Sequence, residues 1–130
     1  MRFPTSRPTR RLLIVEDDDN AALLLESILE PEPGTRVVGR ARHGREALTM
    51  AAALNPDLIL MDLNMPIMDG VEAIRKLRAV GSKARIIVTT GVDDAAMLHE
   101  ARLAGADAVL AKPPTRDDLL AAIGPASRRR

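Results

Sequence analysis

Side chains that could do chemistry follow four short apolar runs in this sequence of 130 residues. They are carboxylates, an amide, hydroxyls and one ammonium group, in chain order Glu16, Asp17, Asp62, Asn64, Thr89, Thr90 and Lys112. Carboxylates crowded together repel one another, so an ionised cluster of them needs a cation. Several carboxylates and a carbonyl suit Mg²⁺, which keeps several waters and often binds a phosphate oxygen. With a lysine and a hydroxyl beside them, such groups could place a phosphoryl group on Asp62.

Asp62 ends a buried-looking apolar run within the stretch LILMDLNMPIMDG, residues 58–70. An unpartnered carboxylate is costly to bury because its ionised form loses its hydration. We therefore expect a cation or a hydrogen-bonding partner where this run ends. A nucleotide hydrolase could also place an acid there, but the sequence contains no G-x-x-x-x-G-K-[ST] phosphate-binding loop.

The elements that must position these side chains alternate along the chain. Short apolar runs predict strands over residues 11–16, 36–41, 57–62, 85–90 and 107–111. Helical spacing of apolar residues predicts helices over residues 20–30, 44–54, 71–80, 94–104 and 116–123. Leu24 and Ile28 recur at this spacing in the first helix, and Ile74 and Leu77 face inward in the third.

This alternation predicts an α/β fold, a doubly wound parallel sheet between two layers of helices. The strands are apolar without alternating, which is typical of strands covered on both faces. Crossovers in such sheets are right-handed, which leaves only a few strand orders. Because ligands bind beyond the carboxyl ends of the strands, four of the five strands can bring their terminal residues to one crevice.

The composition fits one domain without disulfides or membrane segments. Hydrophobic residues make up 46% of the chain and cysteine is absent. No apolar run approaches the roughly 20 residues that span a bilayer. We expect a cytoplasmic protein with a basic tail over residues 1–10, one domain over residues 11–124 and a second basic tail over residues 125–130.

Charge is distributed unevenly between the ends and the body of the chain. Seven of the nineteen basic residues lie at positions 2, 7, 10, 11 and 128–130. Residues 12–127 then hold twelve basic and eighteen acidic residues, a net charge of −6. Basic ends could touch the phosphates of nucleic acids or membranes, but solvated tails explain them more simply. We therefore expect neither direct nucleic-acid binding nor membrane attachment.

Four motifs together resemble the response regulator receiver domain. They are VEDDD after the first strand, LMDLNMPIMDG at the end of the third, VTTG after the fourth and AKPP after the fifth. Their order and spacing cover nearly the whole chain, and the MD…MP.MDG pattern is highly specific for that family. The resemblance implies a flavodoxin-like (βα)₅ sandwich of three layers with strand order 2-1-3-4-5.

The resemblance also implies a metal site and a phosphate acceptor. It makes Asp62 the aspartate that attacks the phosphorus of a phosphohistidine. Glu16 and Asp17 match the acidic pair of the family, of which Asp17 would bind Mg²⁺ directly and Glu16 through water. Asn64 would give the metal its backbone carbonyl, and Mn²⁺ could substitute for Mg²⁺.

Two further residues complete the set that the resemblance implies. Lys112 would pair with the phosphoryl group, and Pro113 is expected after a cis peptide bond. Thr90, immediately before Gly91, matches the switch hydroxyl of the family better than Thr89 does.

The implied function is a phosphorylation-dependent switch in two-component signalling, not an enzyme that acts on external substrates. The phosphoryl donor would be a sensor histidine kinase or a phosphotransfer protein. Phosphorylation would remodel the face formed by helix 94–104, strand 107–111 and helix 116–123. A homodimer could form through the same face.

The chain departs from the family pattern at Val109. Receivers usually carry Tyr or Phe three residues before the conserved lysine, and this aromatic turns inward as the threonine moves toward the phosphoryl group. Valine is too short to swing in the same way. We therefore expect a conformational switch that is weaker or that acts through different residues. A smaller departure is Pro114, where an aromatic residue often follows the Lys-Pro pair.

Two other functions stay open from the sequence. An aspartyl phosphatase would use Asp62 as its nucleophile, but such enzymes usually need a second carboxylate two residues later, where this chain has Asn64. A constitutive interaction module would use the fold without phosphorylation, and Val109 makes this interpretation more plausible than usual.

Several remaining polar residues have simpler expected roles. Asp18 and Asp19 are expected to cap and charge the first helix, because acids favour helix N-termini. His43 is expected to be exposed in a loop without a partner. Asp69 and Gly70 are expected to form a turn before the third helix.

Overall fold

The computed structural model describes residues 9–65, 67–91 and 95–124 of the chain. Its strands are β1 (Arg10–Val15), β2 (Thr35–Ala41), β3 (Leu58–Asp62), β4 (Arg85–Thr90) and β5 (Ala108–Ala111). Its helices are α1 (Asp19–Leu29), α2 (Gly44–Leu54), α3 (Gly70–Ala79), α4 (Ala95–Ala104) and α5 (Arg116–Ile123). Every element ends within one residue of its predicted bounds. Most of the two predicted tails, residues 1–8 and 125–130, lies outside the described residues.

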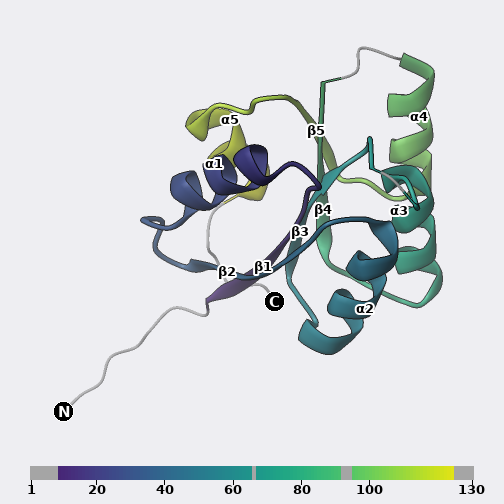
Figure 1. The fold of residues 1–130 in the computed structure, drawn as a ribbon, viewed down its shortest axis with the longest axis horizontal. Coiled ribbons are helices and arrows are strands. Elements are labelled where there is room, and N and C mark those ends of the chain that lie inside the picture. Colours follow the sequence, from purple (N-terminus) through teal and green to yellow (C-terminus); the bar gives the residue numbers. More distant parts are fainter. Residues whose placement is uncertain (1–8, 66, 92–94, 125–130) are drawn as a thin grey trace.

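The five strands form one parallel sheet in the order β2-β1-β3-β4-β5, as predicted. Helices α1 and α5 cover one face of this sheet, and α2, α3 and α4 cover the other (Figure 1). These three layers confirm the doubly wound, flavodoxin-like fold. None of the described helices has the length and apolarity that a membrane crossing requires.

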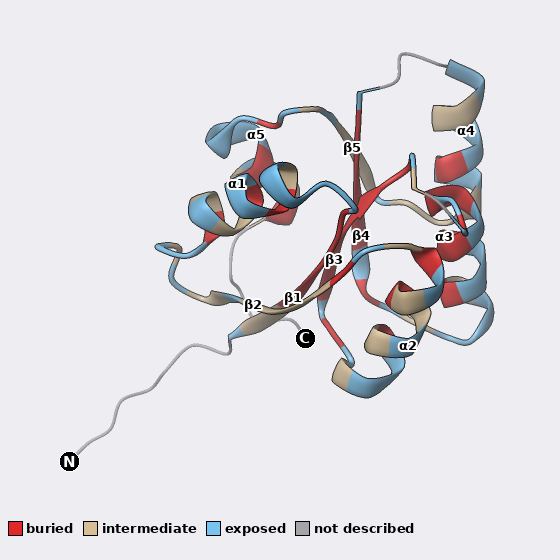
Figure 2. Cartoon of the chain, viewed as in Figure 1, coloured by how far each residue is buried: buried red, intermediate tan, exposed pale blue. Residues whose placement is uncertain are grey.

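The sheet divides the apolar core into two clusters, because successive strand residues point to opposite faces. Leu58 and Leu60 of β3 pack toward α1 and α5, while Ile59 and Met61 pack toward α2, α3 and α4. All five residues of β3 are therefore buried, as the red central strands in Figure 2 show. Burial on both faces explains why this strand is apolar without alternating.

The inward face of α1 includes only one of the two residues named from the sequence, because Ile28 packs on the core and Leu24 does not. Ala22, Leu25 and Leu29 are buried, whereas Leu24 is 42% exposed. Three consecutive leucines at positions 23–25 offer more than one apolar stripe, so the spacing alone did not select the buried one. In α3 the prediction is confirmed, since Ile74 and Leu77 are both buried.

Side-chain caps fix the starts of the helices. The carboxylates of Asp18 and Asp69 accept hydrogen bonds from backbone N–H groups at the starts of α1 and α3, at 2.8 and 2.9 Å. The prediction for His43 is wrong, because this residue is half-buried and caps α2. Its Nδ1 accepts a hydrogen bond from the backbone N–H of Glu46 at 3.2 Å.

Gly70 allows α3 to begin directly against the end of β3. A Cβ atom at this position would lie 2.6 Å from the carbonyl oxygen of Asp62, which is too close for any side chain. The N–H group of Gly70 also donates to the carbonyl of Leu63 at 3.0 Å. The glycine of the MDG sequence therefore holds the turn that follows Asp62.

Arg10 belongs to β1 and not to the predicted basic tail. Its guanidinium donates to the carbonyls of Ile123 and Gly124 at 2.9 and 2.7 Å, and Arg85 donates to the carbonyl of Ala122 at 2.8 Å. These carbonyls end α5, where the helix dipole favours positive charge. At least one of the basic residues near the chain ends is therefore structural.

Candidate functional site

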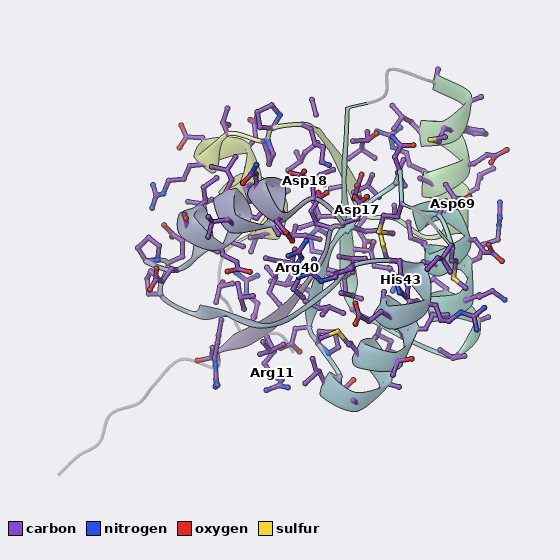
Figure 3. All side chains as sticks on the ribbon, in the orientation of Figure 1. Arg11, Asp17, Asp18, Arg40, His43 and Asp69 are labelled. Atoms are coloured by element: carbon purple, nitrogen blue, oxygen red, sulfur yellow. The ribbon has the colours of Figure 1, made fainter. Side chains whose placement is uncertain are left out.

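The side chains that could do chemistry meet at the carboxyl edge of the sheet. The register between β1 and β3 pairs Val15 with Met61, so the next residues, Glu16 and Asp62, lie level with each other. Asp62 in turn pairs with Thr89 of β4, and Lys112 directly follows β5. The loop after β1 carries Asp17 and Asp18 to the same edge (Figure 3). The crevice expected from strand order is therefore present.

Lys112 is paired with both buried acids of the crevice. Its Nζ lies 2.8 Å from Oε1 of Glu16 and 3.4 Å from Oδ2 of Asp62. Glu16 and Asp62 are only 1% and 2% exposed, whereas the lysine side chain is 25% exposed. One ammonium group therefore faces two carboxylates, which leaves the ionised cluster with a net negative charge.

Backbone N–H groups bind the remaining oxygens of these two acids. The N–H of Asn64 donates to Oδ1 of Asp62 at 3.1 Å, and the N–H of Asp18 donates to Oε2 of Glu16 at 3.2 Å. Both bonds come from residues two positions further along the chain, so each carboxylate is held by its own loop.

Burial and crowding raise the pKa of Asp62 to about 6. The loss of hydration is the largest cause, and the charge of Glu16 adds to it, while the N–H of Asn64 and Lys112 oppose it. Burial lowers the pKa of Lys112, but its hydrogen bond to Glu16 and the charge of Asp62 outweigh burial and raise it overall. The lysine is therefore charged at neutral pH. The ionised form of Asp62 is disfavoured by burial and by Glu16, and a further cation in the crevice would stabilise it.

Three carboxylates of the crevice can share one cation. Glu16, Asp17 and Asp62 each offer an oxygen, and these oxygens lie within 4.8 Å of one another. Two of the acids are buried and Asp17 is exposed, so a cation held here would keep part of its water shell. An all-oxygen donor set with excess negative charge fits Mg²⁺ or Mn²⁺. The predicted role of the Asn64 carbonyl stays a prediction.

The two threonines at the end of β4 take different positions. Both are buried, and neighbouring residues of a strand point to opposite faces of the sheet. Thr89 lines a hollow of about 360 Å³ together with Glu16, Lys112 and Pro113. Thr90 accepts a backbone hydrogen bond from the N–H of Lys112 at 3.0 Å. The switch role predicted for the Thr90 hydroxyl stays a prediction.

The β5 end of the crevice agrees with the sequence in one further detail. The peptide bond between Lys112 and Pro113 is cis, as expected. Val109 is half-buried and packs on the larger core cluster, as do Met97 and Leu98 of α4. β5 therefore presents an aliphatic side chain to this side of the core.

Arg40 was not predicted to reach the crevice, because β2 ends in no carboxylate, hydroxyl or lysine. Its Nε and Nη2 donate to the carbonyl oxygen of Glu16 at 3.0 and 2.9 Å, and its Nη1 donates to Oδ1 of Asp19 at 2.8 Å. Asp19 thus does more than charge α1, because Arg40 and Arg42 both bind it and hold the pKa of its carboxyl below its usual value. A basic residue at the end of the strand beside β1 was the only signal in the sequence.

Comparisons with known proteins identify the family. The sequence model of the response regulator receiver domain matches residues 12–124. The chain belongs to this family. Chemotaxis protein CheY of Thermotoga maritima is 38% identical to the receiver over 104 residues, which cover 80% of this chain and 86% of CheY. The receiver is therefore similar to domains of two-component and chemotaxis response regulators.

Other relatives carry the receiver as one part of a longer protein. A protein-glutamate methylesterase/protein-glutamine glutaminase of Methanospirillum hungatei is 40% identical over 114 residues, which cover 83% of this chain. The receiver spans only 31% of that relative. Among solved structures, the signal receiver domain of the response regulator NarL from Mycobacterium tuberculosis superposes with a TM-score of 0.85. It is 28% identical, and the match covers 89% of this chain and 94% of the NarL domain.

Proposed function

We propose that this receiver accepts a phosphoryl group on Asp62 from a phosphohistidine, with Mg²⁺ bound by the acidic cluster. The supporting observation is the placement of Lys112 within 3.4 Å of two buried acids, beside a third acid that completes a set of oxygen donors. The donor would be a sensor histidine kinase or a phosphotransfer protein. The interior of the cell, where these donors phosphorylate receivers, would be its location.

In the proposed reaction a carboxylate oxygen of Asp62 attacks phosphorus while the phosphorus–nitrogen bond of phosphohistidine breaks. The bonding electrons leave on the imidazole nitrogen, which takes up a proton. Lys112 is placed to neutralise charge that develops on the phosphoryl oxygens, and the N–H of Asn64 holds one oxygen of Asp62 in place. When bound, the cation would neutralise the carboxylates and the phosphoryl oxygens together.

The proposed output is a shift between two conformations, with no released product. Phosphorylation would add about −1.5 to −2 charges at one edge of the sheet. The face that responds would be formed by α4, β5 and α5, and a homodimer could form through it. We propose no activity on external substrates, because Asn64 stands where an aspartyl phosphatase needs a second acid.

Intact mass after incubation with Mg²⁺ and acetyl phosphate tests this function. Wild type should gain one phosphoryl group, and Asp62→Asn should gain none. Asp57→Asn is the matched control, since it removes a carboxylate just before the opposite end of β3 and should leave the phosphoryl adduct unchanged. No adduct on wild type that has been shown to bind Mg²⁺ would instead favour a module that works without phosphorylation.

A further inference from the structure

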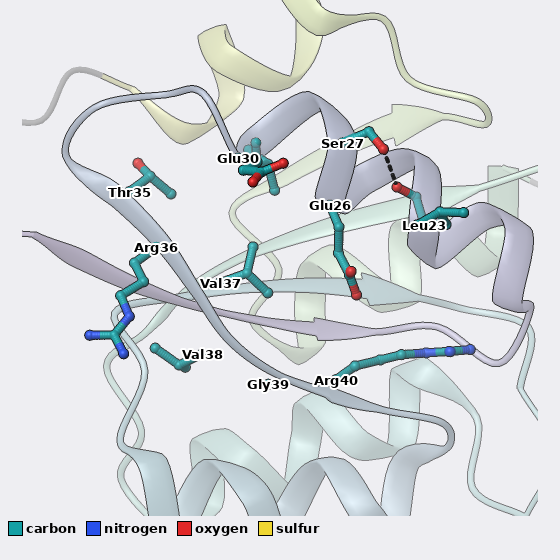
Figure 4. Close-up of a pocket in the computed structure, with 11 residues that line it drawn as sticks. Leu23, Glu26, Ser27, Glu30, Thr35, Arg36, Val37, Val38, Gly39 and Arg40 are labelled. Atoms are coloured by element: carbon teal, nitrogen blue, oxygen red, sulfur yellow. Dashed lines mark hydrogen bonds between the residues drawn. The ribbon is translucent and has the colours of Figure 1, made fainter.

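Arg40 binds the acidic loop from the neighbouring strand. It is the penultimate residue of β2, the edge strand beside β1. Its side chain, 17% exposed, lies along the groove between β2 and α1 (Figure 4). Two of its N–H groups donate to one acceptor, the carbonyl oxygen of Glu16. A largely buried guanidinium thus binds the backbone at Glu16, in the loop that carries the acids of the candidate metal site.

The backbone of Glu16 is held on both sides by β2. Its N–H donates to the carbonyl of Ala41 at 2.9 Å, and its carbonyl accepts the two bonds from Arg40. The carbonyl of Glu16 and the N–H of Asp17 belong to the same rigid peptide plane. Because Arg40 fixes this plane, it also fixes the direction in which the chain enters Asp17.

Asp17 has no comparable support of its own. It is exposed, and its carboxylate accepts no hydrogen bond from the rest of the described chain. Glu16 and Asp62, in contrast, are held by Lys112 and by backbone N–H groups. An oxygen of Asp17 nevertheless lies within 4.8 Å of theirs. Its place in the cluster therefore depends on the backbone that carries it.

We propose that Arg40 is a positioning residue that orients Asp17 toward a divalent cation by holding the carbonyl of Glu16. This inference rests on the proposed function, because it assigns Arg40 a part in the metal site of that function. Groups that orient metal ligands typically change metal affinity by about 10–100-fold when they are removed. We therefore expect a weaker metal site in a protein that still folds.

Arg42 provides a matched control for Arg40. Its Nη1 donates to the same oxygen of Asp19 at 2.8 Å, but none of the described hydrogen bonds joins it to Glu16. Replacing either arginine by methionine removes one positive charge near the acidic cluster. Loss of positive charge alone strengthens cation binding. A weaker site after Arg40→Met would therefore report the lost bonds to the Glu16 carbonyl.

The test is a Mg²⁺ titration of the metal-free full chain, followed by the backbone amide signals of residues 16–18 and 62–64 in NMR spectra. Arg40→Met should raise the dissociation constant about tenfold. Arg42→Met should leave it unchanged or lower it. Arg40→Lys keeps one donor for the carbonyl and should fall between wild type and Arg40→Met. Equal affinities of Arg40→Met and Arg42→Met would overturn the positioning role.

Failure of this inference can be told apart from failure of the proposed function. Wild type that binds Mg²⁺ and is phosphorylated, together with unchanged affinity in Arg40→Met, would overturn only the role of Arg40. Wild type that binds no Mg²⁺ would overturn both. If circular dichroism shows that Arg40→Met is unfolded, the Mg²⁺ affinities of Arg40→Lys and Arg42→Lys are compared instead. Equal affinities of those two variants would overturn the positioning role.

Discussion

At the residue scale, Asp62 is held in a place that opposes its ionisation. Its carboxylate is almost fully buried beside Glu16, and Lys112 supplies one positive charge for both acids. The resulting pKa of about 6 lies above that of the unfolded chain, near 3.8. The folded protein therefore keeps a proton between these pH values that the unfolded chain has already lost. Ionisation of Asp62 thus lowers the free energy of unfolding. The whole of this loss is present above pH 6, and it diminishes as the pH falls toward 4.

Asp62→Asn should consequently stabilise the metal-free protein near neutral pH. The shift corresponds to about 3 kcal/mol, which we reduce to about 2 kcal/mol because water reaches the crevice. Urea unfolding in the presence of a chelator measures the difference between wild type and variant. The difference should shrink as the pH is lowered through 6 toward 4. A variant less stable than wild type at neutral pH would contradict this account of the site.

The placement of the candidate site residues at one edge of the sheet was predictable, because each of them lies at or just after the end of an apolar run. Asp62 and Lys112 can be placed at one edge from strand order alone, and the structure brings them within 3.4 Å of each other. Arg40 and His43 could not be predicted in this way. Their partners, the carbonyl of Glu16 and the N–H of Glu46, are backbone groups that no side-chain pattern reveals.

At the element scale, Arg78 joins α3 to two loops at the amino edge of the sheet. Its guanidinium donates to the carbonyls of Ser82 and Ala84 at 2.9 and 2.7 Å, and to that of Gly105 at 2.8 Å. It also pairs with Asp107 at 3.0 Å. One side chain therefore connects the end of α3 with the loops that lead into β4 and β5.

Arg78→Met should lower the free energy of unfolding by about 2 kcal/mol, since several carbonyls would lose a charged donor at a partly buried position. Urea unfolding measures the change. Arg75→Met is the matched control, because Arg75 is exposed on the same helix and should alter stability by less than about 0.5 kcal/mol. Equal effects of the two substitutions would show that the Arg78 contacts add nothing.

The elements themselves followed from sequence because two patterns agreed. Apolar runs without alternation marked strands covered on both faces, and helical spacing marked the segments between them. The exception was the inward face of α1, where three leucines in a row left the orientation to tertiary packing. The contacts of Arg10 and Arg85 with the end of α5 were also hidden, since they join residues more than thirty positions apart.

At the scale of the whole molecule, the proposed switch must carry a change from Asp62 to the face made by α4, β5 and α5. Val109 occupies the position where the family usually has an aromatic residue, and it packs on the core cluster that Met97 and Leu98 of α4 also contact. A short aliphatic side chain cannot move between a buried and an exposed position as far as an aromatic ring can. We therefore expect a weaker coupling between the site and this face.

Amide chemical shifts on phosphorylation test that coupling. The changes should be large around Asp62 and small near Val109 and along α4. Val109→Tyr should enlarge the changes over α4, β5 and α5, because it supplies the missing ring, while Val80→Tyr, at an exposed position after α3, should not. Large changes over the whole face in wild type would contradict a weakened switch.

The most direct test of the central claim uses a small donor with a phosphorus–nitrogen bond, phosphoramidate, as a substitute for phosphohistidine. Phosphorus NMR follows the receiver with the donor, with and without Mg²⁺. The account predicts an acyl phosphate signal on wild type that requires Mg²⁺ and is absent from Asp62→Asn. An acyl phosphate that forms equally well in Asp62→Asn, or none on wild type with Mg²⁺ demonstrably bound, would contradict it.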